Sequence, residues 1–162
     1  PQAVRPPQQR GQDNEKSKFN MNVHYSSKTY DWSTPQDFFE RYDRIYNFKL
    51  DVCASVFNAK CEKFFTVEDD GLEQNWTGQC WMNPPYGRSI GKWMQKAYES
   101  CVKNNATVVC LVPSRTDTKW WHDYAMKGDI EFIKGRLRFG GAKENAPFPS
   151  AVITFKPETI RL

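Results

Sequence analysis

The sequence predicts an α/β fold with a largely parallel, doubly wound sheet, and three observations lead to this prediction. Short apolar stretches typical of strands alternate with stretches in which apolar residues recur at helical spacing. The most apolar stretch, residues 106–112, is typical of a strand buried on both faces. Asp51 and Asn83 each stand at the end of a predicted strand. Ligands of such sheets bind at the carboxyl ends of the strands, so both side chains are expected to face one crevice.

Length and composition favour one domain. The 162 residues suffice for a sizeable core, and the 15% aromatic content argues against a disordered chain although the mean hydropathy is −0.76. Residues 1–28, rich in Gln and Pro, are expected to form a disordered basic tail before a single domain at 29–162. No apolar stretch approaches the roughly 20 residues of a membrane-spanning helix, and no signal-peptide pattern opens the sequence. A soluble protein without a membrane partner is therefore expected.

The cysteines and the charge distribution exclude few further classes of protein. The five cysteines are odd in number and form no C-x-x-C pair, so neither a disulfide framework nor a metal site is expected. Residues 1–30 carry five Lys or Arg and two Asp or Glu, residues 31–110 carry nine and eleven, and residues 111–162 carry nine and six. Two basic ends around an acidic middle fit solvated surface and contact with a polyanion about equally well.

The first elements follow from the apolar spacing. Residues 33–35, Ser-Thr-Pro, are predicted to start a helix, with hydroxyl caps and proline at the first helical position. The apolar face of that helix is made of Phe38, Phe39, Tyr42, Ile45 and Tyr46. Asn47 is expected to end the helix, and a short alternating strand then ends near Asp51. Residues 53–78 show no clear pattern apart from one turn.

The remaining elements complete the alternation. Residues 80–82 are a brief apolar strand. The helix that follows has an apolar face made of Ile90, Trp93, Met94, Ala97 and Cys101. After the buried strand, Thr116 or Asp117 is predicted to cap a third helix that carries a tryptophan pair. Residues 130–133 and 151–155 then form a late strand pair.

The run Asn83-Pro84-Pro85-Tyr86 suits a specific chemical problem. An exocyclic amine is a poor nucleophile because its lone pair is conjugated. The Asn83 side-chain oxygen and a backbone carbonyl of this loop can hold both N–H groups and so localise the lone pair toward an electrophile. Each proline restricts the residue before it to extended conformations, which makes the loop rigid. Tyr86 supplies a flat face for stacking that also tolerates a cation.

These residues resemble the catalytic motif of S-adenosylmethionine-dependent amino-methyltransferases, and the ordered set of motifs is similar to the small phage-type DNA N6-adenine methyltransferase family. The set spans nearly the whole predicted domain and comprises Trp32-Ser33-Thr34-Pro35, Leu50-Asp51-Val52-Cys53-Ala54-Ser55, Asp70-Gly71-Leu72, Asn83-Pro84-Pro85-Tyr86-Gly87, Leu111-Val112-Pro113-Ser114-Arg115, Gly135-Arg136-Leu137-Arg138-Phe139 and Pro149-Ser150-Ala151. The resemblance implies methyl transfer from S-adenosylmethionine to N6 of adenine in DNA. It also implies a compact class I, Rossmann-like sheet with an antiparallel late hairpin, in the cytoplasm of a bacterial cell or phage-infected host.

Site residues are implied by the same resemblance. Asn83, Pro84, Pro85 and Tyr86 would be catalytic, and the cofactor would be held by Thr34, Pro35, Asp51, Cys53, Ala54, Asp70 and Asn83. In this reading Thr34-Pro35 packs over the methionine moiety and Asp70 lies near the adenosine. A plain helix start and a plain turn residue, respectively, stay open as alternatives. One departure from methyltransferases at large is that residues 51–60 contain no glycine, whereas a G-x-G loop usually follows the first strand.

Five cations are candidates for nucleic-acid binding, because they follow strand ends or lie in the late hairpin: Arg88, Arg115, Lys134, Arg136 and Arg138. Solvated surface is the alternative for each. The implied partner is double-stranded DNA, from which the target base must be flipped to reach the methyl donor. A homodimer would enlarge the DNA contact of so small an enzyme, but the sequence does not fix the oligomeric state.

The same motif is compatible with other substrates and with a non-catalytic role. An exocyclic amine is all that the motif requires, so RNA adenine, cytosine N4 and a protein glutamine amide stay open as targets. A catalytically silent nucleic-acid-binding module is a further alternative, which measurable cofactor binding would exclude.

Overall fold

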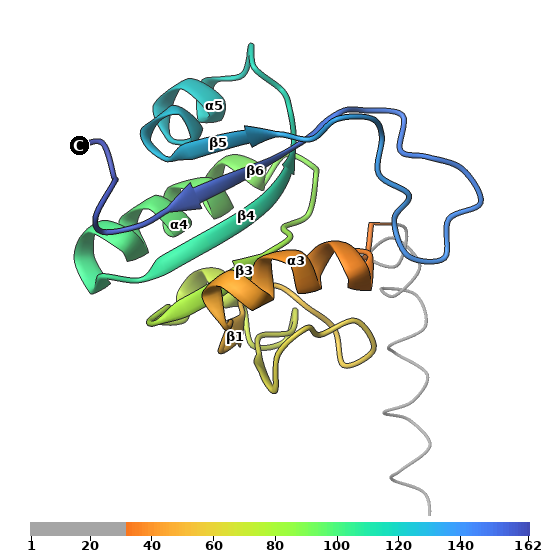
Figure 1. Cartoon of the computed structure of the whole chain (residues 1–162). Helices are drawn as coiled ribbons and strands as arrows, with labels where there is room; N and C mark the ends of the chain where they lie inside the picture. The colour runs from red at the N-terminus through yellow and green to blue at the C-terminus, as the bar shows by residue number, and fades with distance from the viewer. Residues whose placement is uncertain (1–31) are drawn as a thin grey trace, which may run out of the picture.

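A mixed sheet of six strands forms the centre of the computed structural model, which describes residues 32–162; the expected tail at 1–28 lies outside them. The strand order is β2-β1-β3-β4-β6-β5. The strands are β1 (Leu50–Asp51), β2 (Lys63–Phe64), β3 (Gln79–Met82), β4 (Thr107–Pro113), β5 (Asp129–Phe132) and β6 (Ser150–Phe155). Strands β1 to β4 are parallel, and β6 runs antiparallel between β4 and β5 (Figure 1).

This topology places five strand ends at one edge of the sheet. Because β5 and β4 both pair antiparallel with β6, β5 points in the same direction as the parallel strands. The carboxyl ends of β1 to β5 therefore share an edge, and the loops that leave them are neighbours. The long loop between β5 and β6 projects from the body at this edge (Figure 1).

Helices cover both faces of the sheet. On one face lies α3 (Gln36–Tyr46), and on the other lie α4 (Ile90–Asn104) and the short α5 (Lys119–Asp123). Strand β4 is buried along its whole length, and its side chains alternate between the two layers. Val109 and Leu111 pack with the α3 cluster, whereas Val108, Cys110 and Val112 pack with the α4 cluster.

The structure confirms both long helices, the buried strand and the late antiparallel pair. The predicted apolar face of α4 is buried at all five positions. In α3, Phe38, Phe39 and Tyr42 are buried and Tyr46 packs against the core, but Ile45 is 70% exposed and does not belong to the buried face. Asn47 ends α3 in the left-handed conformation, with φ of 51°. Strand β2 was not predicted, because two residues carry no periodic signal.

The predicted helix starts are wrong in detail. Pro35 is the N-cap of α3 and not its first helical residue, and no side chain caps this helix. The Thr34 hydroxyl, expected to cap, instead accepts a hydrogen bond from the Asn83 side chain. In α5 the cap is Thr118, whose hydroxyl accepts from the Trp121 amide, and not Thr116 or Asp117.

Among residues 32–162, no helix combines the length and the apolar composition needed to cross a bilayer.

Gly71 opens the 3₁₀ turn at Gly71–Glu73 and meets the end of the β1 strand at very close range. A Cβ atom at this position would lie 2.3 Å from the Val52 carbonyl oxygen. The Gly71 carbonyl also accepts a buried hydrogen bond of 2.8 Å from the Trp76 indole. The turn therefore needs glycine for close packing, and this packing fixes the position of the neighbouring Asp70.

Replacing Gly71 with alanine should lower the free energy of unfolding by about 1–3 kcal/mol, because the added methyl group pushes the turn away from backbone that cannot move freely. Denaturant unfolding followed by circular dichroism measures the effect. Gly87→Ala is the matched control, since a Cβ at Gly87 meets nothing within 4 Å. Equal stability of Gly71→Ala and the wild type would contradict the packing role.

Candidate active site

A cavity of about 750 Å³ opens where the strands β1, β2 and β3 end. Its walls come from segment 32–34, the loop that follows β1, residues between 65 and 72, the loop 83–86 and Trp93 of α4. The volume lies in the range of small-molecule and cofactor sites. Of the ten residues predicted for catalysis and cofactor binding, all but Pro35 line this cavity. The shared edge of parallel strands is the physical reason that they converge.

The Asn83 side chain is fixed by contacts from a distant segment. Its Nδ2 atom donates to the Trp32 carbonyl oxygen at 2.6 Å and to the Thr34 hydroxyl at 3.1 Å. Its Oδ1 atom is buried and has no hydrogen-bond partner among the described residues. Buried polar atoms are nearly always paired, and an orphan acceptor at the wall of a cavity marks the position of a missing donor. Of the polar atoms of this amide, Oδ1 is therefore the one that remains for a donor from a ligand.

The Pro84 carbonyl is a second acceptor in the same loop. Pro84 is buried, and none of the hydrogen bonds formed within residues 32–162 reaches its carbonyl oxygen. Proline at position 85 restricts residue 84 to extended conformations, so the loop holds its shape without hydrogen bonds of its own. Two acceptors in one rigid loop suit a ligand group with two N–H bonds.

Tyr86 belongs to a cluster of four aromatic rings. Its hydroxyl donates to the Leu111 carbonyl at 3.2 Å, which ties the ring to the end of β4. The Trp32 ring lies nearly parallel to it, with centroids 6.3 Å apart, and Phe139 and Phe148 meet it edge-on. Burial raises the pKa of Tyr86 well above its usual range, so the phenol stays neutral and cannot act as a base.

Asp51 is a buried carboxylate at the end of β1. It accepts hydrogen bonds from the backbone N–H groups of Lys60, at 3.0 Å, and Cys53, at 3.4 Å. Burial nevertheless dominates and raises the pKa of Asp51 to about 7, against the weaker opposing effects of these bonds and of the Lys60 ammonium. A cationic ligand in the cavity would stabilise the ionised form.

Other predicted cofactor residues differ in their surroundings. Cys53 and Ala54 are half-buried in the cavity wall, and burial raises the pKa of Cys53 to about 12, which keeps its thiol neutral. Asp70 is exposed, in the left-handed conformation with φ of 51°, and its carboxylate makes no hydrogen bond within the described residues. The neighbouring Asp69 carboxylate instead closes the turn, accepting from the Thr66 amide and hydroxyl. Of these two neighbouring aspartates, Asp70 is thus the one whose carboxylate is available to a ligand.

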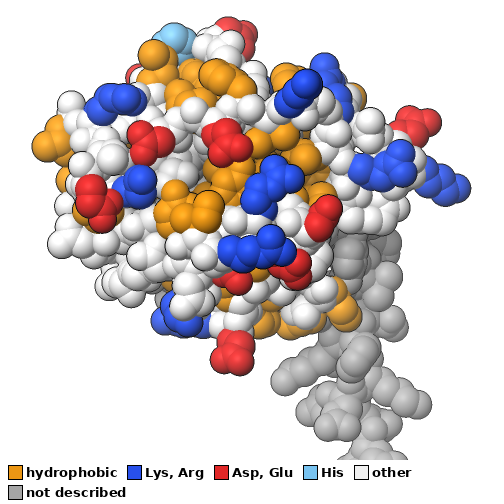
Figure 2. Space-filling model, in the orientation of Figure 1, with side chains coloured by type: hydrophobic (Ala, Val, Ile, Leu, Met, Phe, Trp, Pro, Cys, Tyr) orange, Lys and Arg blue, Asp and Glu red, His pale blue; other side chains and the backbone are white. Residues whose placement is uncertain are grey.

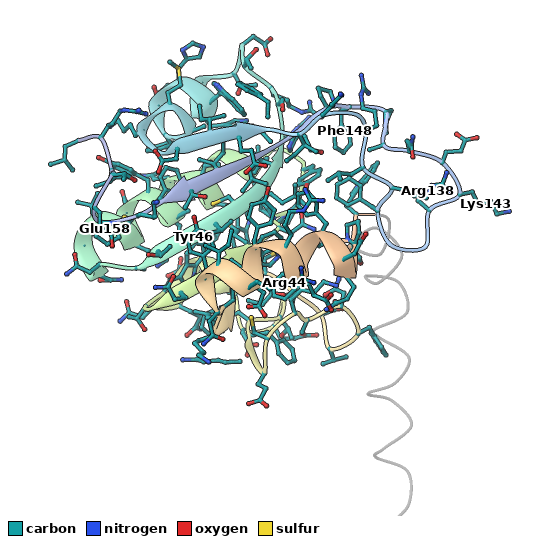
Figure 3. The ribbon with its side chains drawn as sticks, viewed as in Figure 1. Arg44, Tyr46, Arg138, Lys143, Phe148 and Glu158 are labelled. Carbon is teal, nitrogen blue, oxygen red and sulfur yellow. The ribbon has the colours of Figure 1, made fainter. Side chains whose placement is uncertain are left out.

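The five cations predicted to bind nucleic acid lie outside the cavity wall. All are exposed, and none forms an ion pair within residues 32–162: Arg88, Arg115, Lys134, Arg136 and Arg138. They follow the carboxyl ends of β3, β4 and β5, and therefore border the edge at which the cavity opens. Lys and Arg side chains gather over the projecting β5–β6 loop in Figure 2. Arg138 and Lys143 lie on its outer part, and Phe148 lies nearer the body (Figure 3).

Several contributors to the site were not predicted. The Trp32 carbonyl and the Lys60 amide are backbone groups, for which the sequence carries no signal. Phe139 and Phe148 do carry a signal in the sequence, because both interrupt a loop that is otherwise polar and basic. Aromatic residues in such loops are often contacts. Among residues 32–162, no group of three or more His, Cys, Asp or Glu is placed to hold a metal ion.

The family model that matches this chain and the similar proteins named below carry the same description. The family model described as DNA N-6-adenine-methyltransferase (Dam) matches residues 22–156. A DNA N-6-adenine-methyltransferase of Haemophilus phage HP1 is 31% identical over 138 residues, which cover 78% of this chain and 79% of the phage protein. A DNA N-6-adenine-methyltransferase of Escherichia phage T1 is 34% identical over 130 residues, which cover 64% of this chain and 54% of that protein.

The raised pKa of Asp51 predicts a pH-dependent stability. Between its ordinary value of 3.8 and about 7, the folded protein holds a proton that the unfolded chain has released. Stability relative to Asp51→Asn should therefore fall as the pH rises from about 4 to 7 and become constant above 7. Denaturant titrations of both proteins across this range measure the difference. A flat or rising difference would contradict the assignment.

Proposed function

Because the chain belongs to the DNA N-6-adenine-methyltransferase (Dam) family, we propose that it transfers a methyl group from S-adenosylmethionine to the N6 amino group of adenine in DNA. The single observation that carries this chemistry is the orphan Oδ1 atom of Asn83 beside the cavity. The N6 amino group of adenine has two N–H bonds, and the site offers two free acceptors, Asn83 Oδ1 and the Pro84 carbonyl. The match in number and polarity supports the proposal.

In the proposed complex, these two acceptors hold the N6 hydrogens and turn the nitrogen lone pair out of conjugation with the purine ring. When bound, S-adenosylmethionine supplies a methyl carbon activated by its sulfonium, which leaves as a neutral thioether. The nitrogen then carries an extra proton, and neither the amide of Asn83 nor the neutral phenol of Tyr86 can accept it. That proton goes to water. Orientation and fixed dipoles thus account for the catalysis, without a strong base.

The cavity fits the cofactor by chemistry and size. We propose that Asp51 lies beside the methionyl ammonium, which would favour the ionised carboxylate, and that Asp70 accepts from the ribose hydroxyls. Apolar walls such as Phe65 and Leu72 suit the adenine ring. Parallel strands β1 to β4 with an antiparallel β6 agree with the proposed class I sheet. In the glycine-free loop after β1, the backbone N–H groups of Cys53 and Lys60 bind Asp51, and the loop itself forms part of the cavity wall.

The proposed substrate approaches across the edge bordered by the exposed cations. Target adenine leaves the duplex, at a cost of a few kcal/mol of unstacking, and enters beside Tyr86. The β5–β6 loop lies beside this entrance, because its Phe139 and Phe148 pack against the Tyr86 ring while Arg136 and Arg138 stay exposed. Phosphate contacts from this loop would position the duplex over the cavity.

Asn83→Ala should reduce methyl transfer at least about a hundredfold while cofactor binding is retained, because one of two acceptors for the amino group is lost. The measurement is transfer of labelled methyl to plasmid DNA without adenine methylation, followed by nucleoside analysis. Asn75→Ala, an exposed asparagine before β3, is the control. The proposal would be contradicted if the wild type formed no labelled N6-methyladenine, or if Asn83→Ala kept full activity.

The double variant Arg136→Ala/Arg138→Ala should weaken DNA binding. The slope of the logarithm of the binding constant against the logarithm of the salt concentration should become less steep by about 0.9 for each phosphate contact removed. Its affinity for the cofactor should not change. Fluorescence anisotropy with a short duplex at several salt concentrations gives both values. Lys103→Ala, at the C-terminal end of α4 and the opposite edge of the sheet, is the control. The loop would have no role in DNA binding if the two variants showed the same salt dependence.

A further inference from the structure

We propose that Thr34 is a positioning residue for methyl transfer, which acts by holding the Asn83 amide in the orientation that presents Oδ1 to the substrate. The Trp32 carbonyl and the Thr34 hydroxyl together form what we term the amide clamp. This inference rests on the proposed function, in which Asn83 Oδ1 accepts from the target amine. It assigns Thr34 a role that acts through Asn83 and requires no contact with the cofactor.

Two acceptors on one side of Asn83 set its orientation. The Trp32 carbonyl oxygen can only accept, and it lies 2.6 Å from Nδ2. If the amide were turned over, Oδ1 would face this oxygen with no hydrogen between them, which is repulsive. The Thr34 hydroxyl, at 3.1 Å from the same Nδ2 atom, engages the second N–H. With both N–H groups engaged, the amide has no free donor, and Oδ1 is its one polar atom without a partner among the described residues.

Burial and the hydrogen bonds of the neighbouring backbone hold Thr34 in the position that this role requires. It is 5% exposed, and the residues around it are tied to two other parts of the fold. Before it, the Ser33 carbonyl accepts from the Gly140 amide of the β5–β6 loop at 2.8 Å. After it, the Pro35 carbonyl accepts from the Phe39 amide at 3.0 Å in the first turn of α3. The hydroxyl is therefore fixed relative to Asn83 although 49 residues separate them.

Thr34 does not occupy the capping position of α3. The N-cap is Pro35, which has no hydroxyl, and α3 begins at Gln36 with no side-chain cap from the described residues. The Thr34 hydroxyl accepts its hydrogen bond from Asn83 Nδ2, across the fold. This bond is the one that the hydroxyl makes within residues 32–162.

Thr34→Val tests the clamp, because valine keeps the shape of threonine and removes the hydroxyl. The single-turnover rate of methyl transfer should fall roughly tenfold, the size expected for one net hydrogen bond. The dissociation constant for S-adenosylmethionine and the KM for DNA should stay within twofold of the wild type. Thr34→Ser should restore the rate, and Thr107→Val, a buried threonine at the opposite end of β4, should leave it unchanged.

A second measurement needs no substrate. In the protein alone, the two side-chain N–H resonances of Asn83, identified by their absence from Asn83→Ala, should both exchange slowly with solvent. In Thr34→Val one of them should exchange at least tenfold faster, whereas Thr34→Ser should resemble the wild type. Unchanged exchange in Thr34→Val would overturn the clamp.

The outcomes separate the two proposals. A weaker affinity of Thr34→Val for S-adenosylmethionine with an unchanged single-turnover rate would overturn the positioning role and assign Thr34 to the cofactor. A full rate with unchanged affinity would overturn the inference but leave the proposed function intact. If the wild type methylated no DNA, the proposed function would fail, and the exchange of the Asn83 amide protons would decide the clamp alone.

Discussion

The hydrogen bonds from Asn83 Nδ2 to the Trp32 carbonyl and the Thr34 hydroxyl are the contacts on which the proposed chemistry depends. An amide carries a donor and an acceptor at nearly the same positions, and only its surroundings decide which one faces a ligand. Here the surroundings engage the donor and leave Oδ1 buried, with no hydrogen-bond partner from residues 32–162. Such an atom costs stability in the folded protein, which is typical of a group kept for a function.

The topology of the sheet brings together the segments that orient the Asn83 side chain. Parallel strands bring Asp51 and Asn83 to one edge, as expected for an open α/β sheet. The antiparallel β6 returns the β5–β6 loop to the same edge, where the Gly140 amide binds the Ser33 carbonyl and Phe148 packs on the Trp32 ring. The loop that carries the exposed cations is therefore in direct contact with the segment that orients Asn83. The proposed approach of the substrate and the orientation of the Asn83 amide therefore involve segments that touch one another.

Much of this arrangement could be predicted from the sequence, and the rest could not for identifiable reasons. Periodic apolar residues predicted α4 and a continuous apolar stretch predicted β4, and the run from Asn83 to Tyr86 predicted a rigid loop of acceptors after a strand. Thr34 was predicted as a helix cap, because local propensity cannot register a partner 49 residues away. The acceptor at Trp32 belongs to the backbone, which is the same in every residue. Long-range and backbone contacts are the part that only the structure gives.

The proposed role of Asn83 can be tested with a crystal structure of the protein bound to a short duplex, its target adenine flipped, and a non-reactive analogue of S-adenosylmethionine. We expect adenine N6 to lie within hydrogen-bond distance of both Asn83 Oδ1 and the Pro84 carbonyl, while Nδ2 keeps its bonds to Trp32 and Thr34. An adenine held elsewhere, or an Asn83 side chain that has left Trp32 and Thr34 to bind it, would contradict this role.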